Sequence, residues 1–417
     1  MTAVRGQARR FSDTPRGVHV DQPLVLAALA LLAIGIVMVG STSVAVAEKY
    51  QVGEWYFLAR HVLFVLLGLG LAVAVQWLDT RWLEPAGRGF LFASLLLLAL
   101  VLMPGLGVTV NGATRWLNFG LFRFQVVEAV KLLMILYVAG YLARRPDLAR
   151  AGLMETLKPL LVGGLVAAIL LKQPDMGSAV VLMVIVAGMV WLAGATWKHL
   201  SLLGLAALPL ATFAALEPYR LARLTSFGDP FADPYDSGFQ LVQALIAVGR
   251  GEVAGVGLGG SVQKLFYLPE AHTDFIFAIL AEELGLIGIV LVLGLFALMV
   301  VRVFRIGIRA QIAGRGFAAF ACYGIGLWIG LQALVSMGVN LGVLPTKGLT
   351  LPLVSAGGSS ILMLLLALGL VVRIGRELDR AELSRPRRHR EMGFVDMFGD
   401  RRVAAPNGAR QGARREV

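Results

Sequence analysis

Long apolar runs, separated by short polar or basic segments, dominate the sequence from residue 24 to residue 373. The runs are rich in Leu, Val, Ala and Gly and show no strict alternation, so the pattern favours helices over the strands of a barrel. A span needs roughly 20 apolar residues, and on this basis we predict an all-α polytopic membrane protein with about ten transmembrane helices. They are expected at 24–46, 57–78, 88–103, 125–143, 159–172, 178–195, 199–216, 275–301, 316–338 and 351–373.

The composition agrees with this pattern. Of the 417 residues, 58% are hydrophobic and 15% are charged, whereas a typical soluble domain has about 25% charged residues. The first apolar run ends near Ala-Val-Ala at 45–47, which resembles a signal-peptide cleavage site. Because the run is longer than a signal core, an uncleaved helix is favoured. The single cysteine, Cys322, excludes an intramolecular disulfide.

Basic residues set the predicted topology. The net charge of +12 comes from clusters at both ends and in short loops, which is typical of cytoplasmic segments rather than of a nucleic-acid-binding surface. We expect cytoplasmic N- and C-termini and a large external loop, 217–274, between spans 7 and 8. Three parts follow: a basic arm at 1–22, a transmembrane domain at 23–375 and a basic tail at 376–417 typical of disorder. Within the loop, 237–251 is predicted to form a short helix at the outer interface.

The segment Tyr-Leu-Pro-Glu-Ala-His-Thr-Asp-Phe at 267–275 holds three ionisable residues, Glu270, His272 and Asp274, directly before an apolar run. On the predicted topology it faces the outside, where a carboxylate reached by water is suited to general-base chemistry. Asp274 is equally suited to capping the helix that follows, and spacing does not choose between the two roles. No His-Glu-x-x-His motif is present, so a dedicated metal site is not expected.

Other polar residues also interrupt the apolar pattern. Glu128 and Lys131 lie three apart on one helical face, which fits a buried structural pair or part of a site. Trp116, next to Arg115, fits either a site or an anchor at the membrane interface. Ser359 lies in Ser-Ala-Gly-Gly-Ser-Ser, which would ordinarily form a tight turn or a close helix contact. Further candidates in the external loops are Asp175, Arg220, Arg223, Lys264 and Lys347.

Segments along most of the chain are similar to the SEDS family, the polytopic peptidoglycan glycosyltransferases of division, elongation and sporulation. Beside the Glu128 and Lys131 pair, they are NGATRW (111–116), QPDMG (173–177), GFQLVQALIAVGRG (238–251), LGGSVQKLFYLPEAHTDFIFAILAEELGLIG (258–288) and LPTKGLTLPLVSAGGSS (344–360). The forms at 261–275 and 345–352 resemble the division branch. The chain departs from the family in having Val126 and Val127 before Glu128, where Pro-(Ser/Ala) is usual. It also lacks the family's usual aromatic residue at Ala356 and its frequent Asn at Gly260.

This resemblance implies polymerisation of lipid II, a disaccharide-pentapeptide on undecaprenyl diphosphate, into β-1,4 glycan strands during septal cell-wall synthesis. Inversion at the donor sugar needs one base, and the family's essential Asp corresponds to Asp274. The expected groups for stabilising the departing diphosphate are cationic, and they are Arg220, Arg223, Lys264 and Lys347. The other expected substrate-binding residues are Arg115, Trp116, Glu128, Lys131, Glu270, His272 and Ser359.

The expected surroundings of the protein also follow from the resemblance. It implies a class B penicillin-binding transpeptidase and other division-complex membrane proteins as partners, at the septum in the cytoplasmic (inner) membrane. The sequence requires no cofactor; a divalent cation, Mg²⁺ or Mn²⁺, would suit the diphosphate, but no ligand set is visible. The alternatives are a lipid II flippase or transporter, an elongation-type polymerase and a non-catalytic scaffold. Acids within spans, such as Glu282 and Glu283, fit a transporter, whereas the collection of polar groups outside favours a polymerase.

Overall fold

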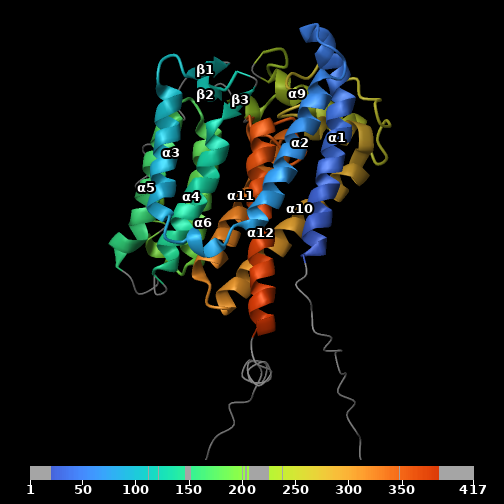
Figure 1. Ribbon diagram of the computed structural model, residues 1–417. Helices are drawn as coiled ribbons and strands as arrows, with labels where there is room; N and C mark the ends of the chain where they lie inside the picture. The colour runs from blue at the N-terminus through green and yellow to red at the C-terminus, as the bar shows by residue number, and fades with distance from the viewer. Residues whose placement is uncertain are drawn as a thin grey trace, which may run out of the picture. The chain divides into compact units, whose positions relative to one another are not determined.

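Helices make up most of the computed structural model, which describes residues 20–384 except 111, 121, 146–151, 200, 202–203, 206–224, 237 and 347. The contacts between residues divide the chain into two units, and the fold described below is that of the unit His19–Leu378. Nine of the ten predicted spans coincide with helices of the described residues, and the predicted span at 199–216 lies largely outside them. The nine are α1 (Gln22–Tyr50), α2 (Tyr56–Ala74), α3 (Gly87–Leu102), α4 (Val126–Ala143), α5 (Leu153–Lys172), α6 (Met176–Leu192), α10 (Ile276–Ile312), α11 (Gly316–Asn340) and α12 (Gly358–Ser384) (Figure 1).

Seven helices in the described part of the chain are long and apolar enough to cross a membrane: α1, α2, α4, α5, α10, α11 and α12. The apolar helices α3 and α6 are shorter, at 16 and 17 residues. Because several separate helices meet the requirement of roughly 20 apolar residues, the chain is a multi-pass membrane protein, as the apolar pattern predicts.

Helix α11 lies inside the bundle and packs against α10, α4 and α6. Its contact with α4 and α6 is close because Gly324 has no side chain: a Cβ there would lie 2.5 Å from Ile135 Cγ2 and 2.7 Å from Met189 Sδ. Small residues allow helices to approach in this way where the hydrophobic effect offers little drive for association. Helix α11 therefore connects the elements that surround the site described below.

A small sheet occupies the segment between α3 and α4, which the sequence predicts only as a loop. Strands β1 (Gly107–Val110), β2 (Ala113–Asn118) and β3 (Arg123–Gln125) pair antiparallel in the order β1-β2-β3. Figure 1 shows the sheet near α9 (Phe239–Arg250), at the end of the bundle opposite the start of α1. The bundle is all-α as predicted, and the sheet adds a wall at its end.

The tenth predicted span begins later than expected, at Gly358 rather than at residue 351. Pro352 lacks a backbone donor, and Leu353 adopts a left-handed φ of 63°, so the chain turns instead of entering the helix. The hydroxyl oxygen of Ser355 accepts a hydrogen bond from the Leu351 amide at 2.8 Å and closes the turn. The segment before α12 therefore forms a buried turn, with Leu351, Leu353 and Val354 in the core.

The predicted short helix at 237–251 is present as α9, which packs against α10. The chain after α9 pairs with α10 where that helix is kinked at Gly285, whose φ is 63° and ψ is −159°. There, Val256 donates to the Glu282 carbonyl at 3.0 Å, and Leu286 donates to the Glu252 carbonyl at 3.0 Å. At the kink, backbone groups of α10 thus form hydrogen bonds with the segment after α9 instead of with their own helix.

Gly285→Ala is expected to destabilise the protein. An added Cβ would lie 2.4 Å from the Gly255 nitrogen and 2.5 Å from the Val253 oxygen, and the strained backbone alone costs about 1–3 kcal/mol for a residue with a side chain. The measurement is the thermal unfolding midpoint of the purified protein in detergent. Gly294→Ala in the same helix is the control, because a Cβ there meets nothing within 4 Å. Equal midpoints for the two variants would contradict this account of the kink.

Candidate functional site

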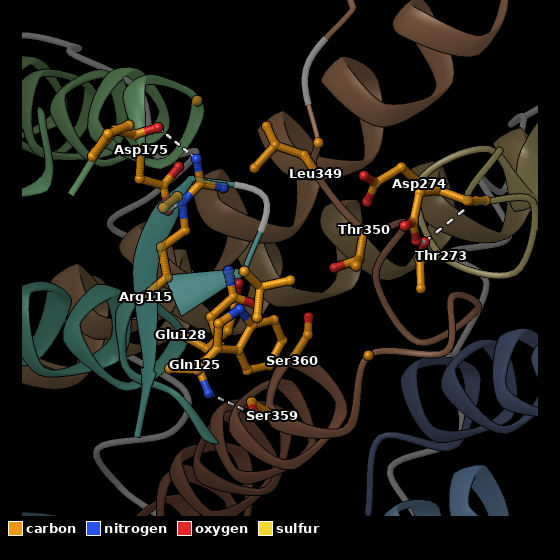
Figure 2. A pocket seen from close by; sticks show the side chains of 18 of the residues that line it. Arg115, Gln125, Glu128, Asp175, Thr273, Asp274, Leu349, Thr350, Ser359 and Ser360 are labelled. Carbon is orange, nitrogen blue, oxygen red and sulfur yellow. Dashed lines mark hydrogen bonds and ion pairs between the residues drawn. The ribbon is translucent and has the colours of Figure 1, made fainter. Parts of the chain in front are cut away.

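A cavity of about 810 Å³ lies where five helices begin and the sheet ends. Its walls come from the three strands, from the starts of α4, α6, α9, α10 and α12, and from residues 345–346 and 348–350. Figure 2 shows Arg115 and Asp175 on one side of it and Thr273 and Asp274 on the other. The predicted site residues that line it are Arg115, Trp116, Glu128, Glu270, Asp274 and Ser359.

Asp274 lines this cavity and is not the N-cap of α10. The N-cap residue is Phe275, and the amide of Ala278 in the first turn donates instead to Asn340 Oδ1 at 2.9 Å. The N-cap position and this amide are therefore held by other residues. Gly348 lies close by: a Cβ there would be 2.9 Å from Asp274 Oδ2.

Hydrogen bonds from elsewhere in the chain fix the backbone of the segment that carries Asp274. The Ala356 amide donates to the His272 carbonyl at 3.0 Å, and the Ser355 hydroxyl donates to the Thr273 carbonyl at 2.6 Å. The Asn340 side-chain amide donates to the Asp274 carbonyl at 3.0 Å. Three consecutive carbonyls are thus bound, so the carboxylate of Asp274 extends from a backbone that is already positioned.

Glu128 and Lys131 form a buried ion pair. Lys131 Nζ donates to Glu128 Oε1 at 2.9 Å and to Gln332 Oε1 at 2.7 Å, and it lies 5.0 Å above the Trp328 ring. Gln332 also donates to the Thr350 carbonyl at 3.0 Å, which joins the pair to a residue of the cavity wall. Only Glu128 of the pair lines the cavity, and its Oε2 has no hydrogen-bond partner among the described residues.

Arg115 and Asp175 lie next to each other on the side of the cavity opposite Asp274 (Figure 2). Arg115 donates to the Pro174 carbonyl, and its Nε lies 3.9 Å from Asp175 Oδ2. Asp175 also caps α6, because its Oδ1 accepts from the Ser178 amide at 3.2 Å. Asp175 is a site residue that sequence reasoning notices but does not select; its place in Gln-Pro-Asp-Met-Gly, shared with the family, is the signal that could have selected it.

Lys264 is a correction to the predicted site. It does not line the cavity; its ammonium donates to Glu283 Oε1 at 2.8 Å, to Ser41 Oγ at 2.8 Å and to the Gly259 carbonyl at 2.7 Å. All three hydrogens of a Lys ammonium are then used. Lys264 therefore holds its loop against α1 and α10, and we remove it from the residues expected to contact the diphosphate.

The remaining predicted residues have different positions. Lys131 and His272 do not line the cavity, although each adjoins a residue that does. The His272 ring lies 5.7 Å from the Phe57 ring, and burial lowers the pKa of His272 below its ordinary value, against the opposing effect of Glu270. Because its pKa is lowered, the imidazole ring of His272 is expected to be uncharged at neutral pH. Arg220, Arg223 and Lys347 lie outside the described residues.

The charges at the cavity bear on what it can bind. Among the described residues that line it, Glu128, Asp175, Glu270 and Asp274 are acidic and Arg115 is basic. In the described part of the chain, no group of three His, Cys, Asp or Glu side chains is placed to hold a metal ion. A divalent cation stays a prediction, which the diphosphate chemistry supports and these side chains do not specify.

Comparisons with known proteins agree on one family. The cell cycle protein family FtsW/RodA/SpoVE matches residues 22–380. The chain is 50% identical over 382 residues to the probable peptidoglycan glycosyltransferase FtsW of Thioalkalivibrio sulfidiphilus, covering 90% of this chain and 96% of that protein. It is 48% identical over 384 residues to the protein of the same name from Halorhodospira halophila, with 91% and 97% covered.

Solved structures agree in fold. One belongs to a study of how a peptidoglycan synthase complex coordinates polymerization and crosslinking; it has a TM-score of 0.71 and 34% identity, with 87% of this chain and 99% of that chain covered. Another is the rod shape determining protein RodA of Thermus thermophilus, with a TM-score of 0.64, 32% identity, and 86% and 97% covered.

Lys131→Met is expected to destabilise the protein more than the double variant Glu128→Gln/Lys131→Met. Removing one partner of a buried ion pair costs about 3–5 kcal/mol, whereas replacing both by uncharged groups of similar volume is often close to neutral. Thermal unfolding in detergent measures the difference. If the single variant were as stable as the double variant, the buried charge of Glu128 would not need Lys131 to balance it.

Proposed function

Because the chain belongs to the FtsW/RodA/SpoVE family of cell cycle proteins, we propose that it is a peptidoglycan glycosyltransferase of the FtsW type, which polymerises lipid II. The observation that carries this proposal is the position of Asp274. It lines a cavity large enough for sugars, at the end of a bundle whose relatives at about half identity are named for this activity. The high identity to FtsW proteins favours septal synthesis over the elongation type.

Asp274 is the proposed general base. It takes the proton of the acceptor sugar's 4-hydroxyl as that oxygen bonds to the anomeric carbon of the donor. The bond between this carbon and the diphosphate oxygen breaks, and its electron pair leaves with the lipid diphosphate. A single displacement inverts an α-linked diphosphate to a β-1,4 bond and needs no covalent intermediate. The bound carbonyls of residues 272–274 hold the base in place for this step.

The other groups at the cavity have proposed binding roles. Arg115 and Trp116 offer a guanidinium and an aromatic ring to the substrate, and Glu128, Glu270 and Ser359 offer hydrogen-bonding oxygens. We expect Arg220, Arg223 and Lys347 to contribute positive charge to the departing diphosphate. Lys131 acts by holding Glu128, and His272 by shaping the loop beside Asp274. Mg²⁺ or Mn²⁺ would share in neutralising the diphosphate.

The proposed partner is a class B penicillin-binding transpeptidase, which would crosslink the strands that this protein makes. A structure from a complex that couples polymerization to crosslinking, similar in fold to this chain, supports it. The multi-pass bundle and the family membership place the protein in a membrane. Its proposed location is the cytoplasmic membrane at the division septum, with the cavity open to the outer face.

Asp274→Asn is expected to abolish glycan polymerisation, with a loss in kcat of at least about 100-fold, because an amide cannot accept the hydroxyl proton. The measurement is polymer formation from labelled lipid II by the purified protein with its transpeptidase partner. Asp236→Asn is the control, since Asp236 is an exposed residue just before α9 that does not line the cavity.

Two outcomes would contradict this proposal. Undiminished polymer from a well-folded Asp274→Asn protein would remove Asp274 as the base. Translocation of lipid II across proteoliposomes by a wild-type protein that makes no polymer would favour the flippase alternative.

A further inference from the structure

Residues from the starts of five helices, α4, α6, α9, α10 and α12, line the cavity, and at two of these helices a side-chain oxygen accepts from a first-turn amide. Asp175 Oδ1 accepts from an amide of the first turn of α6, and Asn340 Oδ1 accepts from an amide of the first turn of α10. At α4, Glu128 lies in the first turn, and the amide of the N-cap residue Gln125 donates to Ser359 Oγ at 2.9 Å. The start of α12 differs from the other helix starts in having a buried hydroxyl, that of Ser360, without a hydrogen-bond partner among the described residues.

The start of α12 presents donors that nothing in the described chain accepts. The amides of Gly358, Ser359 and Ser360 have no acceptor among the described residues, whereas the next amide, of Ile361, is bound to the Gly357 carbonyl at 2.9 Å. First-turn amides point along the helix axis, and the helix dipole adds partial positive charge there. A helix N-terminus alone does not define a binding site, so a second feature is needed.

Ser360 supplies that second feature. Its side chain is buried, with only 4% of the residue exposed, and its hydroxyl has no hydrogen-bond partner among the described residues. Ser360 lines the cavity, and Figure 2 shows its hydroxyl oxygen directed into it, away from Ser359. Buried hydroxyls are normally satisfied, and leaving one unpaired costs free energy. The unpaired donor indicates a ligand group that completes it.

We propose that the N-terminus of α12, with the Ser360 hydroxyl, binds the diphosphate of the lipid-linked donor and stabilises it as it departs. This inference rests on the proposed function, which identifies the substrate. Adjacent amides and a hydroxyl at a helix N-terminus match the several oxygens of a phosphate group. Gly358 has no side chain, and this lets the start of α12 pack closely on α2, because a Cβ there would lie 2.6 Å from Phe64 Cδ2.

The location agrees with the chemistry of inversion. The base and the leaving group must lie on opposite sides of the donor's anomeric carbon. Asp274 comes from the loop before α10 and Ser360 from α12, and Figure 2 shows them on separate parts of the wall. Of the four carboxylates that line the cavity, Glu128 is paired with Lys131 and Asp175 faces Arg115. Their charge is therefore partly neutralised before an anion binds.

Binding of undecaprenyl diphosphate tests this site without turnover. The full chain, purified in detergent with its transpeptidase partner, is titrated with undecaprenyl diphosphate, and Ser360→Ala is expected to weaken binding at least tenfold. Ser360→Thr, which keeps the hydroxyl, is expected to bind within threefold of wild type. Ser336→Ala is the matched control, since Ser336 is also buried and its hydroxyl is also unpaired, but it does not line the cavity.

Competition then identifies the group that is recognised. Inorganic diphosphate that displaces the lipid from wild type, and does so less well from Ser360→Ala, supports recognition of the diphosphate alone. Displacement by undecaprenyl diphosphate but not by inorganic diphosphate supports recognition of the lipid-linked form. Displacement by undecaprenol with equal strength would overturn the proposal, because undecaprenol has no phosphate. Equal affinity of Ser360→Ala and wild type for undecaprenyl diphosphate would also overturn it.

Polymerisation of lipid II separates this proposal from the proposed function. We expect Ser360→Ala to lower kcat at least tenfold, as loss of one donor to a developing anion does, while Ser336→Ala polymerises as wild type. A wild-type protein that binds undecaprenyl diphosphate through Ser360 but makes no polymer would refute the proposed function and leave this site standing. Wild-type polymerisation rates in a folded Ser360→Ala protein would refute the site and leave the function standing. If Ser360→Ala does not fold, Ser360→Cys, whose thiol is a weaker donor, decides between the same outcomes.

Discussion

Backbone that leaves a helix inside an apolar bundle must find hydrogen-bond partners within the protein, and the site depends on how this chain meets that constraint. Residues 251–257 bond to the kinked turn of α10, and the carbonyls of residues 272–274 bond to Asn340, Ser355 and Ala356. These bonds do more than satisfy polar groups. They also fix the path of the segment from which Asp274 extends, so the same bonds that satisfy the backbone position the proposed base.

Two buried acids of α10, Glu282 and Glu283, also hold the neighbouring segment in place. Glu282 accepts from Arg250, from the Ser261 hydroxyl and from the Val262 amide, and Glu283 accepts from Lys264. A lone carboxylate in such a position would be costly, but each of these two is balanced by cations or donors from the loop that it holds. Acids within a span are by default suspected of transport or catalysis. Here the contacts show that Glu282 and Glu283 bind the segment between α9 and α10 to α10.

The sequence predicts much of the fold because apolar length is a local property. It does not predict the sheet between α3 and α4, whose strands are three to six residues long, or the late start of α12. At the site, the sequence does not predict contacts between residues far apart in the chain. Asn340 accepts from the Ala278 amide, 62 residues away, where the sequence suggests Asp274 as a cap. Glu283 accepts a hydrogen bond from Lys264, which the sequence suggests as a site residue. Polar residues four apart at Gln332, Ser336 and Asn340 in α11 were an available signal of a buried polar face.

The convergence of helix starts explains how one cavity can be both acidic and receptive to an anion. Positive partial charge from the N-termini of α4, α6, α9, α10 and α12 lies along the walls where the carboxylates are placed. At α6 and α10 a residue of the chain already accepts from a first-turn amide, and at α4 the carboxylate of Glu128 lies in the first turn. The amides of α12 are left for something that arrives with the substrate. A polymerase must bind the diphosphate for transfer and then release it, and an uncharged set of amides and a hydroxyl is suited to both steps.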